Sequence, residues 1–281
     1  MKIKRTYYQI ISCCFFSLLG LQIKLALLNG NIENIVFFRS FFGTLILFCF
    51  IILSKKKIIS LVTTKKLKIH FLRSIFGILA MYFGYKSLIY LSLAQASTIG
   101  FTKVFFACIF SSFIFSEKIN FSTLLLILIG FSGILFITNP GEINNKTGLY
   151  MSLFSAISVS GGIISISYLS KKEETTNILF FHSLLSSIIF FIIFWQKIDF
   201  RISEELTSYI FLTITALLGQ YFNTESYKYS ETKDIVILSY SRIIFSTLLG
   251  FMFLNEKLTL LNIAGILLII FTTFIVQRKT N

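Results

Sequence analysis

The sequence predicts an all-α membrane protein with ten transmembrane helices, arranged as two inverted five-helix repeats. Three observations predict this fold class. Hydrophobic residues make up 55% of the 281 residues and charged residues only 14%, whereas a soluble domain carries about 25% charged residues. The apolar residues form runs long enough to cross a hydrocarbon core of about 30 Å. Two of these runs, 101–119 and 240–258, superimpose without a gap when one is shifted by 139 residues.

Ten spans follow one another along the chain, and their short connections make neighbours antiparallel. The first run lacks a cleavage site and leads directly into further spans, so it is predicted to be an uncleaved helix rather than a signal peptide. The only proline, Pro140, lies between spans, which predicts mostly unbroken helices. The predicted spans are residues 7–27, 33–53, 71–91, 93–115, 120–138, 147–169, 177–197, 206–227, 232–254 and 258–276.

Lysine and arginine in the loops predict the orientation. With the N-terminus inside, sixteen of these residues lie on the cytoplasmic side and four on the outer side. Both termini are therefore predicted to be cytoplasmic, in a multi-pass protein of the inner membrane. The same loop charges explain the net charge of +14 without a nucleic-acid partner. The other six cations lie within spans: Lys24, Arg39, Arg73, Lys86, Lys103 and Arg242.

The 139-residue shift extends to residues 82–128 against 221–267, where polar as well as apolar positions match. The chain divides into a first repeat, 1–140, and a second repeat, 141–281, each with five spans. Because five is an odd number, the second repeat enters the membrane in the opposite sense. Transporters built this way hold their substrate near the midplane, where the repeats meet.

Lys103 and Arg242 occupy matched positions deep in the fourth and ninth spans. A charge at that depth costs about 2.5–3.5 kcal/mol on insertion scales. Arginine suits carboxylate or phosphate groups, and lysine acts as a compact point charge. We expect the two cations to bind an anionic group in a water-filled cavity; pairing with backbone carbonyls or closing a gate is the alternative.

Other polar groups within the spans extend this candidate site. Lys24, Arg39 and Lys86 would make an outer vestibule positive, or else would reach lipid headgroups. Glu225 is a candidate gating group or an ordinary interfacial charge, and Arg73 is expected to be an anchor near the cytoplasmic surface. The further substrate-binding candidates are Tyr82, Tyr85, Gln95, Tyr221, Tyr240 and Asn223.

The sequence argues against an enzyme. It holds only two histidines, His70 and His182, and lacks the H-E-x-x-H, G-x-S-x-G and phosphate-binding loop patterns. The four cysteines lie in apolar runs without metal-ligand spacing. We therefore expect no catalytic residues, no metal and no cofactor, and the expected partners are a small anionic or zwitterionic solute and the lipid bilayer, with the chain a monomer or homodimer.

The chain resembles the drug/metabolite transporter superfamily, in particular its ten-span EamA-type members. The resemblance covers essentially the whole chain, and its motifs lie in the family order. One departure is that Val104 and Ile243 stand where the family often has a proline, about thirteen residues before the glutamate. The matching motifs are FFRSFFG (37–43), LRSIFG (72–77), YKSLIYLSLAQAS (85–97), SEKI (116–119), NEKL (255–258) and NIAGILLII (262–270).

The resemblance implies a secondary transporter that works by alternating access, as exchange or facilitated transport. It would permit amino acids, nucleotide-like metabolites or S-adenosylmethionine-like compounds as substrates. An efflux carrier for amphipathic metabolites or drugs is the alternative within this class. A membrane-embedded enzyme or a lipid scramblase is the alternative from another class.

Overall fold

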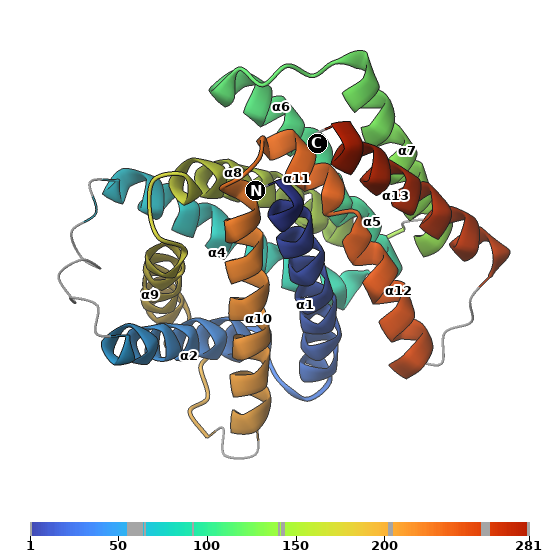
Figure 1. The fold of residues 1–281 in the computed structure, drawn as a ribbon. Helices are drawn as coiled ribbons and strands as arrows, with labels where there is room; N and C mark the ends of the chain where they lie inside the picture. Colours follow the sequence, from blue (N-terminus) through green and yellow to red (C-terminus); the bar gives the residue numbers. More distant parts are fainter. Residues whose placement is uncertain are drawn as a thin grey trace.

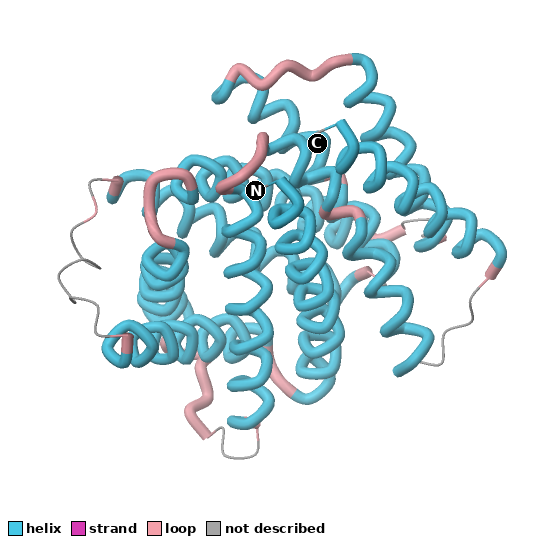
Figure 2. Tube along the Cα trace, viewed as in Figure 1, coloured by secondary structure: helices cyan, strands magenta, loops and turns pink. Residues whose placement is uncertain are grey.

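The computed structural model describes residues 2–54, 64, 66–91, 93–139, 141, 144–201, 205–253 and 259–279. Every regular element in these ranges is an α-helix (Figure 2). The helices are α1 (Lys2–Asn29), α2 (Ile32–Leu53), α4 (Leu67–Tyr90), α5 (Leu93–Phe101), α6 (Lys103–Phe115), α7 (Phe121–Thr138), α8 (Lys146–Ser170), α9 (Thr175–Phe194), α10 (Leu206–Tyr227), α11 (Thr232–Leu238), α12 (Ser241–Phe253) and α13 (Leu260–Lys279).

Nine segments of the described chain are long and apolar enough to cross a membrane. They include α5 with α6 as one segment, 95–115, and α11 with α12 as another, 232–253. The remaining predicted span, 206–227, is the 22-residue helix α10, which is not among the nine. Gln220, Asn223 and Glu225 lower its hydropathy, so the tenth crossing stays a prediction.

Two predicted spans are broken, whereas each of the others corresponds to one helix in the described residues, so the expectation of mostly unbroken helices holds apart from these two spans. The fourth span divides at Thr102 into α5 and α6, and the ninth divides at Ser239 and Tyr240 into α11 and α12. The backbone tightens there into three-residue turns: the Thr102 amide donates to the Ile99 carbonyl at 3.0 Å, and the Tyr240 amide donates to the Ile237 carbonyl at 3.1 Å.

Hydroxyl groups bond the backbone at both breaks, and neither break contains a proline. The Thr102 hydroxyl donates to the Ile99 carbonyl at 2.6 Å, and the Ser241 hydroxyl donates to the Leu238 carbonyl at 2.5 Å. The Ser239 hydroxyl makes the same kind of bond at 2.6 Å. Such bonds compete with the regular ladder of a helix. The Thr102 and Ser241 bonds correspond under the 139-residue shift.

Helices from the two predicted repeats pack against each other in pairs. α1 lies along α10, α4 along α8, α2 along α9 and α7 along α13 (Figure 1). Where α7 meets α13, the Gly133 carbonyl oxygen lies only 2.5 Å from the place that a Cβ of Gly265 would occupy. The two backbones therefore touch without side chains between them, as small residues permit in membrane helices.

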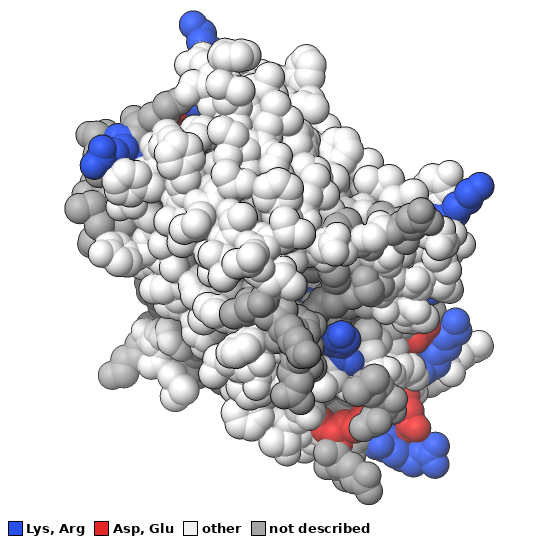
Figure 3. Space-filling model, turned by 90° about the vertical axis from the view of Figure 1, so that its right-hand side faces the viewer, with Lys and Arg blue, Asp and Glu red and all other residues white. Residues whose placement is uncertain are grey.

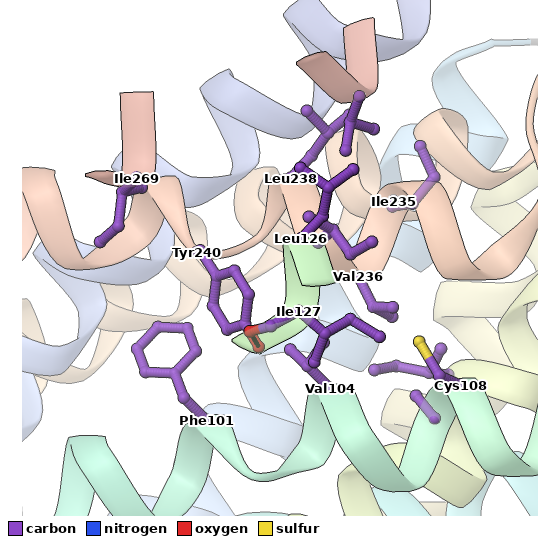
Figure 4. Packing of buried hydrophobic residues seen from close by; sticks show 14 of the residues in the cluster. Phe101, Val104, Cys108, Leu126, Ile127, Ile235, Val236, Leu238, Tyr240 and Ile269 are labelled. Carbon is purple, nitrogen blue, oxygen red and sulfur yellow. Dashed lines mark hydrogen bonds between the residues drawn. The ribbon is translucent and has the colours of Figure 1, made fainter. Parts of the chain in front are cut away.

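A hydrophobic cluster holds the broken helices together (Figure 4). Tyr240 is completely buried in it, with its ring against Gly130 of α7 and its hydroxyl donating to the Ile127 carbonyl at 3.3 Å. Phe101 and Tyr240 occupy equivalent positions under the 139-residue shift, and the centres of their rings lie 5.9 Å apart. A second cluster joins α1, α2, α4, α9 and α10.

The outer surface suits a lipid environment. Figure 3 shows one face on which a broad area carries no lysine, arginine, aspartate or glutamate. Large apolar side chains such as Phe113, Met252 and Leu260 are more than half exposed. Such exposure is rare on a soluble monomer, so the structure supports a multi-pass membrane protein.

Carboxylates of the described chain join helices at the end of the molecule where the N-terminus lies. Asp234 of α11 lies 3.6 Å from Arg5 of α1, and the Glu117 carboxylate accepts the Thr232 and Lys233 amides at 2.8 and 3.2 Å. Val276, near the end of α13, packs into the same cluster as α11. The start of α1 and the end of α13 therefore both lie beside α11. The repeat partner of Glu117, Glu256, lies outside the described residues.

Candidate functional site: an internal cationic cavity

An internal cavity of about 330 Å³ lies between the two predicted repeats. Its walls come from α1, α4, α5 and α6 of the first predicted repeat and from α8, α10 and α12 of the second, and α2 and α9 contribute one residue each. The volume falls in the range of small-molecule sites. Serines and glycines line much of it, which leaves room between the helices.

Four cations face this cavity: Arg39, Arg73, Lys103 and Arg242. His182 is a fifth lining residue with a basic nitrogen. No aspartate or glutamate lines the cavity in the part of the chain that the structure describes. Like charges gathered in a medium of low dielectric need an opposite charge to offset the cost of burial. The arrangement therefore suits an anion.

Lys103 and Arg242 stand directly after the two helix breaks. Lys103 is the first residue of α6, and Arg242 is the second residue of α12. Helix starts carry a partial positive charge, which adds to that of the side chains. The Lys103 amine lies 5.0 Å from the centre of the Phe101 ring, and the Arg242 guanidinium lies 5.7 Å from that of Phe16. Gly20 leaves space beside the guanidinium of Arg242.

Two serine hydroxyls hold these breaks in matched ways. Ser160 of α8 donates to the Lys103 carbonyl at 2.9 Å, and Ser17 of α1 donates to the Arg242 carbonyl at 2.8 Å. Each hydroxyl also lies 2.8 Å from a carbonyl of its own helix, one turn earlier. The first helix of each predicted repeat thus contacts the cation of the other repeat.

Arg39, Arg73 and His182 form a second group of basic side chains in the cavity wall. All three are buried, and Arg39 donates to the Tyr85 hydroxyl at 2.6 Å. A Cβ at Gly77 would lie 2.4 Å from the His182 ring and 2.5 Å from an Arg73 terminal nitrogen. The missing side chain at Gly77 therefore makes the space in which these two groups meet.

Five predicted site residues share the cavity, and Asn223 of α10 is the fifth beside Lys103, Arg242, Tyr85 and Arg39. Arg39 was expected in an outer vestibule and instead lies in the wall. Arg73, expected as an anchor near the cytoplasmic surface, is also in the wall with only 6% of its surface exposed. Its signal in the sequence is Gly77, four residues later on the same helix face.

The other predicted site residues do not line the cavity. Lys86 donates to the Tyr82 hydroxyl at 3.0 Å, and the Tyr82 ring stacks on Phe194. Glu225 joins two helices by accepting the Thr175 hydroxyl at 2.5 Å, and it also pairs with Lys228. The remaining positions outside the cavity wall are Lys24, which is half-buried, Gln95, Tyr221, which is exposed, and the buried Tyr240.

Sequence reasoning missed three residues. His182 is a single histidine in an apolar helix, and no motif or regular spacing in the sequence marks it as part of a site. Ser17 and Ser160 are single hydroxyls among many, and only their matched bonds distinguish them. Within the described residues, no group of three or more His, Cys, Asp or Glu could hold a metal ion.

Comparison with known proteins gives a family match over both halves. The sequence matches the family described as the EamA-like transporter family over residues 6–139 and again over 146–278. It is 25% identical over 267 residues to a protein of Pseudomonas aeruginosa strain UCBPP-PA14 named pseudopaline exporter CntI, covering 94% of this chain and 92% of that one. A protein of Helicobacter pylori named uncharacterized transporter is 26% identical and covers 70% of this chain, which spans 69% of it.

A solved crystal structure has the same arrangement of helices. The two structures align with a TM-score of 0.80 at 14% sequence identity, covering 100% of this chain and 99% of the other. At that identity the likeness concerns the fold alone.

Proposed function

Because the chain belongs to the EamA-like transporter family, we propose that it is a secondary transporter for a small metabolite that bears a carboxylate or phosphate. One observation carries this proposal: four lysine and arginine side chains face an internal cavity whose described lining includes no carboxylate. An anionic solute supplies the charge that this cavity lacks. Charge-assisted hydrogen bonds to such a solute contribute about 1.5–3 kcal/mol each.

We further propose that transport proceeds by alternating access between two inverted repeats in the inner membrane. The helix breaks at matched positions support this proposal, as does the pairing of α1 with α10 and α4 with α8. Discontinuous helices that present their positive ends to anionic groups are a known feature of such carriers. The cavity would then face each side of the membrane in turn.

The cavity favours some of the expected substrates over others. Amino acids, nucleotide-like metabolites and S-adenosylmethionine-like compounds all carry an anionic group or can do so. An amine or sulfonium group on the solute would find no carboxylate among the described lining residues. The proposal therefore leans toward solutes with net negative charge.

We propose that the protein exports its substrate, either by exchange or by facilitated transport. The specific observation that favours it is the likeness to a protein named as an exporter, which extends over 94% of the chain. Membership of a transporter family also argues against the enzyme alternative.

Transport by reconstituted protein tests the proposed function. Proteoliposomes loaded with a panel of labelled carboxylates and phosphate esters should release at least one of them faster than protein-free vesicles. Lys103→Gln and Arg242→Gln should each lower the apparent affinity about tenfold or more, because each removes a charge-assisted contact. Lys86→Gln is the matched control, since Lys86 lies in a span but bonds Tyr82 outside the cavity wall.

Two results would contradict the proposal. One is transport of cationic or neutral solutes in preference to every anion of the panel. The other is unchanged anion transport by both the Lys103 and the Arg242 variants, because a solute held elsewhere would not sense these charges.

A further inference from the structure

Three polar side chains lie together on the face of α10 that lines the cavity. Gln220, Asn223 and Thr224 all belong to the cavity wall, and their spacing of three and four residues places them on one side of the helix. Under the 139-residue shift, the positions in α4 equivalent to the first two are Met81 and Gly84, which also line the cavity. Neither of these offers a hydrogen-bonding side chain. The fold therefore does not itself require polar groups at such positions.

Two side chains of this polar face hold buried atoms that the rest of the described protein does not bond. The Oε1 atom of Gln220 and the hydroxyl of Thr224 are buried and have no hydrogen-bond partner, and Thr224 is only 1% exposed. Other polar groups of the wall are bonded within the protein. The Ser155 hydroxyl donates to a carbonyl of α4 at 2.8 Å, and the Gln9 side-chain oxygen accepts the Ser226 hydroxyl at 2.9 Å. Because a buried polar group without a partner is costly, a solute that bonds these two atoms gains affinity.

The polar face of α10 lies beside the cations of the cavity. Gln220 and Arg39 line the main cavity and also a second hollow of about 10 Å³, so both side chains surround one small space. A Cβ at Gly219 would lie 3.1 Å from the Phe16 ring, whose centre is 5.7 Å from the Arg242 guanidinium. A single ring therefore links α10 to Arg242. A small solute whose anionic group is bound by these cations lies within reach of α10.

The chemistry of the two unbonded atoms indicates which group would bind them. A carboxylate accepts hydrogen bonds and donates none, and the Oε1 atom of Gln220 also only accepts, so the anionic group itself does not suit it. A hydroxyl both donates and accepts, so it suits Gln220 in either orientation of the side-chain amide, and it suits the Thr224 hydroxyl as well. An ammonium group would also donate, but the four cations of the cavity would repel its charge.

We infer that the solute bears a neutral hydroxyl group in addition to its anionic group, and that Gln220 and Thr224 bind this hydroxyl. This inference rests on the proposed function and makes it more specific. It narrows the substrate class to hydroxycarboxylates and hydroxylated phosphate esters. The cations would attract any small anion, and the polar face of α10 would select among them.

Binding of matched probes to the purified full-length protein tests the inference. Each probe set has one chain length and one anionic group, either a carboxylate or a phosphate ester, and carries hydrogen, hydroxyl, methoxy or ammonium at the same carbon. In at least one set, the hydroxyl probe should bind about tenfold or more tightly than the unsubstituted probe, because it provides a partner for buried polar atoms. The methoxy probe should lack this advantage because it cannot donate a hydrogen bond, and the ammonium probe should bind most weakly.

Variants of α10 connect this preference with the structure. Gln220→Met introduces the residue found at the equivalent position of α4. It should reduce the hydroxyl-to-unsubstituted affinity ratio about tenfold and leave the affinity for the unsubstituted probe close to that of the wild type. Thr224→Val should lower the ratio in the same direction, and it serves as the test if Gln220→Met fails to fold.

Thr215→Val is the matched control for these variants. Thr215 is also a buried threonine of α10, but its hydroxyl donates to the Phe211 carbonyl at 2.9 Å and it does not line the cavity. The affinity ratio of this variant should equal that of the wild type.

The outcomes separate this inference from the proposed function. Equal binding of hydroxyl and unsubstituted probes in every set would overturn the inference and leave the proposed function standing. A methoxy or ammonium probe that binds as tightly as its hydroxyl counterpart would also overturn it, because donation by a neutral group would not explain the preference. A preference that survives in both the Gln220 and the Thr224 variants would overturn it as well, since the hydroxyl would then be bound elsewhere. If no carboxylate or phosphate ester bound at all, both would fall together.

Discussion

Gly77 is a position at which one missing side chain shapes the binding site. A methyl group there would press on the ring of His182 and the guanidinium of Arg73. Alanine also favours the helix by about 1 kcal/mol relative to glycine, which offsets part of the 1–3 kcal/mol typical of overpacking. The substitution should therefore displace the two basic side chains more than it unfolds the protein.

We predict that Gly77→Ala lowers anion affinity about tenfold and changes the thermal unfolding temperature by only a few degrees. Ligand titration and thermal unfolding in detergent measure the two quantities. Gly100→Ala is the matched control for an added methyl group in the cavity wall, because Gly100 also lines the cavity but a Cβ there would meet no atom within 4 Å. Equal losses of anion affinity in both variants would contradict the proposal that Gly77 makes space for His182 and Arg73.

The serine hydroxyls at the helix breaks act on the cations through the backbone. We predict that Ser160→Ala and Ser17→Ala each weaken anion binding about fivefold, since each removes one hydrogen bond worth about 1 kcal/mol. Ser165→Ala in α8 is the control, because the Ser165 hydroxyl bonds only the Gly161 carbonyl of its own helix. Titration with a transported anion measures all three. A loss confined to one of the two serines would speak against their matched roles.

The site residues that could be predicted from the sequence are the charged residues that lie far from both ends of a predicted membrane span. Lys103 and Arg242 could be identified because charge in the middle of an apolar run is costly. Arg73 was misplaced because its distance from the helix start resembles that of an interfacial anchor, and burial depends on neighbours far away in sequence. Tyr240 was included because tyrosine suits a cavity wall, but its ring fills the space above Gly130.

At the scale of elements, helix ends and breaks depend on single polar groups. The Glu117 carboxylate caps α11 from a different segment by accepting two backbone amides. We predict that Glu117→Ala lowers the free energy of unfolding by about 1–2 kcal/mol, as loss of a helix cap does. Chemical or thermal unfolding in detergent measures this loss.

The control for Glu117 is Glu231→Ala. Glu231 pairs with Lys233 at 2.6 Å but is more than half exposed, and such surface pairs contribute about 0–1 kcal/mol. A Glu117 variant as stable as the Glu231 variant would contradict the capping role.

The apolar runs predicted the positions of the helices well, but they did not predict the two helix breaks. Helix positions follow from hydrophobic length, which the sequence displays directly. At Thr102 and Ser239 a hydroxyl bonds a carbonyl three residues earlier. The same bond occurs in unbroken helices such as α4 and α9, so a serine or threonine in the sequence does not by itself indicate a break. Because proline was the only break signal considered, the sequence predicted mostly unbroken spans, and the two breaks were not predicted.

At the scale of the whole molecule, the start of α1 and the end of α13 both lie beside α11, as expected for an even number of crossings. The loop cations predict that this end lies in the cytoplasm. We predict that a fluorescent protein that matures only in the cytoplasm is bright when fused to either terminus, and that alkaline phosphatase fused there is inactive. Active phosphatase at both ends would reverse the orientation, and activity at one end would exclude an even number of crossings.

The gathered charge of the cavity bears on the return half of a transport cycle. Four like charges that line one cavity repel one another unless counter-ions enter. We therefore expect an unloaded molecule to take up small inorganic anions, such as chloride, before it turns back. The chloride concentration on each side of the bilayer would then affect the rate at which the unloaded protein returns.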